Sequence, residues 1–288
     1  MEYFVLFARV LGFGLFNSAW IFTVLYGVER LWPKGRPSAT VQLSSLRFWA
    51  IYAVAGAVLA TAFKATSTVA DIEPLIIIRM EDHLPPWAAY VVGPALTVIA
   101  YDFFNYWMHR AQHKWFWAQH AVHHSIRDLS AINSYFHWTE EMFRIAFIAL
   151  PSAVLFDLEI GGATIVSTLL LAAYGNFIHS ASTLHFGKTG RLILADNRWH
   201  RIHHSIERGH FNKNFGTGVT FWDRLFGTAY YPENEEWPDV GVRGEAEIST
   251  VGNYLWRPFR RSIAAQSDVV TAVTCEPAIA SLTDRQAG

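Results

Sequence analysis

The feature that most constrains the fold is a histidine-rich segment that occurs twice. His120-Ala-Val-His123-His124-Ser-Ile is followed eighty residues later by His200-Arg-Ile-His203-His204-Ser-Ile, and a further pair, His109 and His113, precedes the first copy. On a helix, spacings of three and four residues place the members of one cluster on a single face. Neutral histidine is the commonest metal ligand. One ion cannot use eight such ligands, so the pattern predicts two metal ions where the clusters meet.

The alternative is that the histidines are ordinary buried residues. A single histidine in an apolar chain is usually hydrogen-bonded to a neighbour and carries no metal. Here, however, 13 of 288 residues are histidine, and the same ligand spacing occurs twice. We therefore favour the metal-site interpretation.

The composition predicts a membrane protein. Hydrophobic residues make up 52% of the chain and charged residues only 16%, so the charges cannot cover all the apolar surface. A bilayer core about 30 Å thick needs about 20 helical residues. The apolar residues are concentrated in five runs, at 3–26, 48–63, 87–100, 142–156 and 160–178.

We expect 3–26, 87–100 and 160–178 to span the bilayer. The runs 48–63 and 142–156 are short, so they are either completed by flanking residues or form tilted or partly buried helices. A soluble, all-helical core is the alternative. The predicted fold is an all-α integral membrane helical bundle of about four transmembrane helices, with a cytoplasmic helical cap that holds a di-metal site.

Three parts of the chain are expected. N-terminal membrane helices and a loop occupy residues 1–85, a catalytic domain occupies 86–256, and a polar, loosely ordered tail occupies 257–288. Basic residues predominate in the loop after the first run and around the histidine clusters, so the positive-inside rule places the clusters in the cytoplasm. If 87–100 descends and 142–178 forms a hairpin that rises and returns, all the clusters reach the same end of the bundle.

The order of the histidine motifs, and of two short elements after them, is highly specific. His-x3-His and two copies of His-x2-His-His precede Asn214-Phe-Gly and Trp222-Asp-Arg-Leu-Phe-Gly-Thr. Over residues 88–230 the chain resembles the fatty acid hydroxylase and sterol desaturase superfamily. The resemblance implies a membrane-bound, non-haem di-iron enzyme that uses O2 to hydroxylate, desaturate or oxidatively cleave a lipid. Sterol-like, fatty-acyl, carotenoid-like and alkyl-ether substrates all remain open.

The resemblance also implies the ligands of two iron ions. His179, in Asn-Phe-Ile-His-Ser, corresponds to a further histidine near the metal centre of the superfamily. The ligand set carried over is His109, His113, His120, His123, His124, His179, His200, His203 and His204.

A ligating imidazole usually has its other nitrogen held by a carboxylate or carbonyl. Asp102 and Asn105 precede His109 by seven and four residues, and Asp196 precedes His200 by four, so we expect these side chains to support the ligands. For Asp196, helix capping is the alternative. His137 matches a His-Pro-x-Glu position of many relatives, although Trp138 replaces the proline, and it either supports the site or makes a structural hydrogen bond.

Aromatic residues near the cytoplasmic ends of the spans are candidates to contact substrate, with core packing as the alternative. They are Phe103, Phe104, Trp107, Tyr135, Phe136 and Phe177.

The sequence contains neither a dinucleotide-binding Gly-x-Gly-x-x-Gly turn nor a Walker A motif. The two electrons of each turnover must then come from a separate reductase with a ferredoxin or cytochrome, and a basic surface would suit an acidic carrier. We expect no nucleic-acid partner.

Zinc is the alternative metal, because histidine clusters suit it equally well. A di-zinc hydrolase acting on a lipid could use Asp128 or Glu207, but the His-Glu-x-x-His pattern does not occur. A non-enzymatic metal-binding membrane protein is the third alternative.

Overall fold

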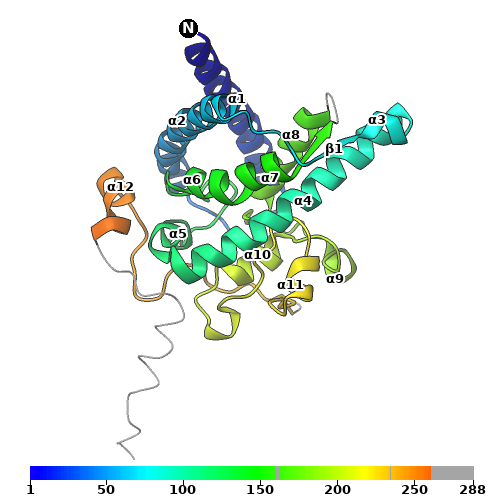
Figure 1. Ribbon diagram of the computed structural model, residues 1–288. Helices are drawn as coiled ribbons and strands as arrows, with labels where there is room; N and C mark the ends of the chain where they lie inside the picture. Colours follow the sequence, from blue (N-terminus) through cyan, green and yellow to red (C-terminus); the bar gives the residue numbers. More distant parts are fainter. Residues whose placement is uncertain (160–162, 234, 261–288) are drawn as a thin grey trace, which may run out of the picture.

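The structure is a computed structural model that describes residues 1–159, 163–233 and 235–260 (Figure 1). Most of the predicted polar tail, 257–288, lies outside the described residues. The helices and strands, in chain order, are α1 Glu2–Leu31, α2 Ala39–Val69, β1 Ile76–Arg79, α3 Met80–His83, α4 Pro86–Trp115, α5 Trp117–His124, α6 Glu140–Arg144, the π-helix η1 Ile145–Ala149, α7 Leu150–Leu155, β2 Phe156–Glu159, α8 Ala163–Phe177, α9 Gly187–Gly190, α10 Asn197–His203, the 3-10 helix η2 Arg208–His210, α11 Phe221–Leu225 and α12 Val251–Arg260.

Three helices, α1, α2 and α4, are long and apolar enough to cross a membrane. The predicted helical membrane bundle is confirmed. The run at 48–63 is completed by flanking residues in the 31-residue α2, which was one of its two expected outcomes. The run at 160–178, which was expected to span, yields the 15-residue α8 instead. Helix α2 continues through small polar residues because their hydroxyls bond within the helix, as Thr61 does to the Ala57 carbonyl (2.7 Å).

Helices α6, η1 and α7 form the outward arm of a hairpin, and α8 returns. At its tip β2 pairs in parallel with β1, with Ile76 opposite Phe156 and Arg79 opposite Glu159. The all-α prediction did not include this short pair. β1 contains three consecutive isoleucines, and β-branched residues favour extended backbone.

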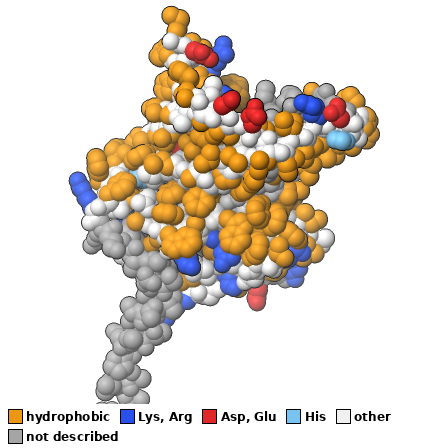
Figure 2. Space-filling view, viewed as in Figure 1, with side chains coloured by type: hydrophobic (Ala, Val, Ile, Leu, Met, Phe, Trp, Pro, Cys, Tyr) orange, Lys and Arg blue, Asp and Glu red, His pale blue; other side chains and the backbone are white. Residues whose placement is uncertain are grey.

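The loop between α1 and α2 lies against the histidine-bearing segments, which we call the cap (residues 116–137 and 178–260). The Lys34 backbone N–H donates to the Ala181 carbonyl (2.9 Å), and Lys34 Nζ lies 2.6 Å from Glu235. The C-terminal ends of α1 and α4 therefore face the cap together. Lys and Arg side chains gather along the cap edge of the molecule, below a broad apolar surface (Figure 2).

Aromatic packing joins the cap to α2. Phe48 lies with its ring centroid 4.5 Å from that of Tyr135 and 4.8 Å from that of Tyr254 on α12. All three side chains are fully buried. Burial of such large rings stabilises the attachment of the cap.

A buried carboxylate in α1 joins two loops of the cap. Glu29 Oε1 accepts hydrogen bonds from the backbone N–H groups of Ala131 (2.8 Å) and Ala181 (2.9 Å). Its Oε2 accepts from Gln42 of α2 (3.1 Å). The two loops follow the first histidine cluster and His179, so Glu29 fixes their relative position.

We predict that Glu29→Ala destabilises the protein by about 2–3 kcal/mol, because two buried N–H groups lose a charged acceptor. Glu29→Gln should cost much less. Its amide oxygen can still accept hydrogen bonds from both N–H groups. The new amide nitrogen can donate to the buried Gln42 Oε1, which has no partner among the described residues. Thermal unfolding in detergent measures both variants, and equal losses would contradict this account.

Candidate metal centre

Helices α4, α5 and α10 and the end of α8 present nine histidines to one region. All nine are at most 6% exposed. They form two sets, and within each set the ligand atoms lie within 4.8 Å of one another. Set A comprises His109, His113, His120, His124 and His203, and set B comprises His123, His179, His200 and His204.

The Nε2 atoms within each set face one another. In set A, His109 Nε2 lies 3.0 Å from His120 Nε2, and His203 Nε2 lies 3.1 Å from His124 Nε2. In set B, His200 Nε2 lies 3.0 Å from His179 Nε2. Two imidazole nitrogens in neighbouring positions around one ion, each bonded at 2.0–2.1 Å, are about 3 Å apart. The residues therefore fit a metal ion in each set.

Backbone carbonyls hold the opposite nitrogen of four rings. The Nδ1 atoms of His109, His123, His179 and His203 lie 2.8, 3.1, 2.7 and 2.8 Å from the carbonyl oxygens of Phe215, Tyr135, Gly175 and Lys213. A carbonyl only accepts, so each Nδ1 carries the proton and each Nε2 keeps a lone pair for a metal.

Two of these carbonyls belong to the loop 213–219, which two aspartates hold in place. Asp223 accepts from the Phe215 and Gly216 backbone N–H groups (2.8 and 2.7 Å). Asp102 accepts from those of Gly218 and Val219 (2.7 and 2.9 Å). The Trp-Asp-Arg-Leu-Phe-Gly-Thr element thus acts through Asp223 to shape the loop that orients His109 and His203.

The residues expected to support the ligands directly have other partners. Asp102 bonds the loop, and Asn105 donates to Thr217 Oγ1 (2.9 Å). Asp196 caps α10 by accepting from the Trp199 N–H (3.0 Å) and pairs with Arg191 (3.2 Å). His137 lies 2.7 Å from Thr139 Oγ1 and packs on Tyr254. The backbone carbonyls that hold the histidine Nδ1 atoms were therefore not predicted, because every residue carries a carbonyl and the sequence does not mark which ones are used.

Burial keeps the cluster histidines neutral. Desolvation lowers the pKa of His179 to about 4, and it lowers the pKa values of His123, His200 and His204 well below the usual value, helped by neighbouring imidazoles. Neutral imidazole is the form that binds metal.

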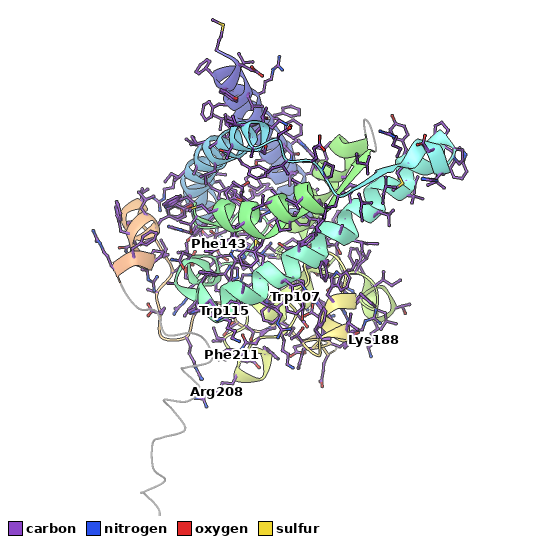
Figure 3. The ribbon with its side chains drawn as sticks, viewed as in Figure 1. Trp107, Trp115, Phe143, Lys188, Arg208 and Phe211 are labelled. Carbon is purple, nitrogen blue, oxygen red and sulfur yellow. The ribbon has the colours of Figure 1, made fainter. Side chains whose placement is uncertain are left out.

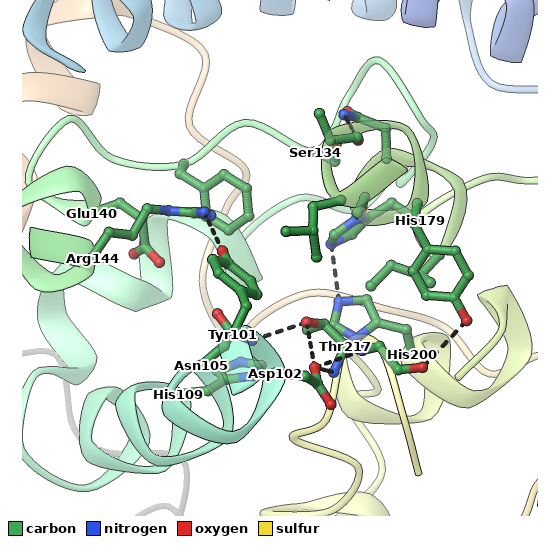
Figure 4. A pocket seen from close by; sticks show the side chains of 18 of the residues that line it. Tyr101, Asp102, Asn105, His109, Ser134, Glu140, Arg144, His179, His200 and Thr217 are labelled. Carbon is green, nitrogen blue, oxygen red and sulfur yellow. Dashed lines mark hydrogen bonds between the residues drawn. The ribbon is translucent and has the colours of Figure 1, made fainter. Parts of the chain in front are cut away.

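A cavity of ≈ 720 Å³ reaches the histidines, and residues of α4 and α8 contribute to its lining. His109, His120, His123, His179 and His200 line it, and most of the lining surface is apolar, although polar side chains also contribute. Of the six aromatic residues predicted to contact substrate, only Phe136 lines it. Tyr101, Glu140 and Arg144 form a polar group at its wall (Figure 4) and were not predicted from the sequence.

Replacing Gly216 by alanine should lower metal content and stability. A Cβ there would lie 2.7 Å from the Val219 carbonyl oxygen and 2.9 Å from Asp223 Oδ2, so the loop behind His109 and His203 must shift. Gly209→Ala is the matched control, because a Cβ at that position meets no atom within 4 Å. Elemental analysis and thermal unfolding of both variants check the prediction, and two equally stable, metal-replete proteins would contradict it.

The metal-free protein should lose stability as the pH falls from 7 to 5. Unfolded histidines take up protons below about pH 6.5, whereas the folded clusters stay neutral to a lower pH (about 4 for His179). Proton uptake then favours the unfolded state in that window, by at most about 1.4 kcal/mol per pH unit for each histidine. Melting temperatures at several pH values measure the effect, and no decline between pH 7 and 5 would contradict buried, neutral clusters.

Comparison with known proteins agrees with this geometry. Residues 94–228 match the fatty acid hydroxylase family. The chain is 32% identical over 182 residues to ornithine lipid hydroxylase OlsE of Rhizobium tropici, covering 61% of this chain and 52% of that protein. It is 30% identical over 163 residues to the alkylglycerol monooxygenase of Xenopus tropicalis, covering 52% and 32% of the two chains.

The chain thus spans about half the length, or less, of these relatives. No solved structure matches it significantly. The family match contains every histidine of both sets, and the two relatives are named as a lipid hydroxylase and an alkylglycerol monooxygenase. Residues 94–228 therefore form a fatty acid hydroxylase domain.

Proposed function

We propose that this protein is a membrane-bound, non-haem di-iron oxygenase that uses O2 and two external electrons to hydroxylate or desaturate a lipid. The observation that carries the proposal is the pair of buried histidine sets at an apolar cavity. A cavity of this size suits part of a lipid molecule, and the family match supports the oxygenase class.

Set A would hold one iron ion and set B the other. Iron bound by neutral imidazoles supplies the activation of dioxygen that lipid oxidation requires. The chain's own residues supply the geometry. Carbonyls fix the four rings named above, and Asp102 and Asp223 fix the loop that contributes two of those carbonyls.

The apolar wall of the cavity would bind the lipid and exclude water. Leu170, Leu171 and Ala172 of α8 line it opposite Val98 and Met108 of α4. Because α4 and α8 belong to the apolar bundle, we infer that the lipid enters from the bilayer. The relatives named above act on an ornithine lipid and an alkylglycerol, which supports a lipid with a polar group as substrate.

A separate electron donor would bind the cap. We infer from the positive-inside rule that the cap faces the cytoplasm, because the α1–α2 loop and the histidine-bearing segments are both rich in Lys and Arg. Arg208 lies at the lower end of the cap (Figure 3). Trp115 is exposed at the C-terminal end of α4, and Lys114 Nζ lies 4.9 Å from its ring. An acidic ferredoxin or cytochrome would be attracted to this face.

The di-zinc hydrolase is less well supported. Asp128 accepts from the Ser38 backbone N–H (2.7 Å), and Glu207 is exposed. Neither lines the cavity, so neither is placed to act on a bound lipid.

The proposal is tested with detergent-purified protein, supplied with reductase and ferredoxin and with a bacterial lipid extract. We expect about two iron ions per chain, oxygen uptake that depends on the donor, and a lipid product changed by one oxygen atom or two hydrogens. Two zinc ions with no oxygen uptake, after reconstitution with iron, would contradict it.

Replacing His123 or His203 by alanine should abolish oxygen uptake and lower the iron content, because each removes a ligand from one set. His185→Ala is the matched control, since His185 is exposed and its Nδ1 accepts from the Gly187 N–H. Elemental analysis and donor-dependent turnover measure the difference. Full turnover by either cluster variant would refute the ligand assignment.

A further inference from the structure

The cavity wall contains a guanidinium group whose role the metal sets do not explain. Arg144, at the end of α6, lines the cavity and donates from Nη1 to the Tyr101 hydroxyl (2.8 Å) (Figure 4). Its Nε is buried and has no hydrogen-bond partner among the described residues. Among the described residues, no carboxylate oxygen lies within 4 Å of a guanidinium nitrogen of Arg144.

The nearby carboxylates already have donors of their own. Glu140 Oε2 accepts from Gln112 (2.6 Å), and Glu141 Oε2 accepts from the Tyr52 hydroxyl (3.0 Å). Burial raises the pKa of Glu140, although the nearby Arg144 guanidinium opposes that rise. A guanidinium beside an apolar cavity is costly unless an anion or another strong acceptor pairs with it.

Arg144 is also close to the metal region. Its guanidinium carbon lies 5.4 Å from the centroid of the Phe136 ring, and that ring stacks on His123 of set B at 4.1 Å. One aromatic ring therefore separates the guanidinium from a candidate ligand. A group bound by Arg144 would be held beside the histidines, with the remaining cavity free for an apolar chain.

We propose that Arg144, positioned by Tyr101, binds an oxyanion of the lipid substrate, a carboxylate or a phosphate, and thereby selects anionic lipids. Calling the bound lipid a substrate rests on the proposed function. The anion-binding site at Arg144 does not depend on it. An arginine suits such a group because its planar N–H donors match the oxygens of either anion.

The test is a binding assay that needs no turnover. Tritiated hexadecanoate, hexadecyl phosphate and hexadecanol share one chain length and differ in the polar group. Their affinities for iron-loaded, detergent-purified full-length protein are measured at pH 8 by scintillation proximity. We expect at least one anion to bind roughly tenfold to hundredfold more tightly than the alcohol, as for a hydrogen bond to a charged group. The tighter anion identifies the source of the oxyanion.

Variants assign that preference to Arg144. Arg144→Gln should abolish it and Arg144→Lys should keep part of it. Arg47→Gln is the control and should leave it unchanged, because Arg47 also stacks on an aromatic ring, Phe48 (4.8 Å), but does not line the cavity. If Arg144→Gln does not fold, Tyr101→Phe replaces it, and the preference should fall severalfold.

Equal affinity of the alcohol and both anions for the unaltered protein would overturn the inference. So would an unchanged preference in Arg144→Gln, or in Tyr101→Phe where that variant replaces it. An anion preference that depends on Arg144 in a protein without oxygenase activity would leave this inference standing and refute the proposed function. Turnover of lipids with no anion preference would do the reverse.

Discussion

The structure depends on one constraint, which is that nine buried imidazoles share one region. Such groups cannot all be protonated, because burial and mutual repulsion both oppose the charge. They also cannot all hydrogen-bond to one another, because facing Nε2 atoms that each offer a lone pair repel. Metal ions remove both difficulties at once. Metal binding and the folding of the cap are therefore expected to be coupled.

The rest of the molecule arranges the backbone around this region. Glu29 holds the two loops that follow His124 and His179, and the aspartates 102 and 223 hold the loop that follows α10. In each case a buried carboxylate accepts from backbone N–H groups, and the backbone in turn orients a ligand. A mutation can thus affect the metal site without altering any residue that touches it.

The sequence predicted those parts of the fold and site that follow from local spacing. The clusters at 109–124 and 200–204 predicted helices with one histidine face, and they lie on α4, α5 and α10. Apolar composition predicted the bundle. The length of α2 was left open between two outcomes, and hydroxyl groups that bond within the helix allow the longer one. The length of α8 was overestimated, because an apolar run does not show where its helix begins. Asp102 bonds the backbone of a loop rather than a ligand, and Asp196 caps α10, which was the alternative kept open for it. Helical spacing places a side chain on a face but does not choose its partner. Arg144 was not predicted to be functional, because residues far apart in the sequence form the cavity and no local pattern indicates it.

The central claim is that the two histidine sets hold two iron ions. The most direct measurement is an anomalous difference map from crystals of the iron-reconstituted protein, with data collected above and below the iron absorption edge. The account predicts two peaks that appear only above the edge, one within His109, His113, His120, His124 and His203 and one within His123, His179, His200 and His204. A single peak, or no peak within either set, would contradict it.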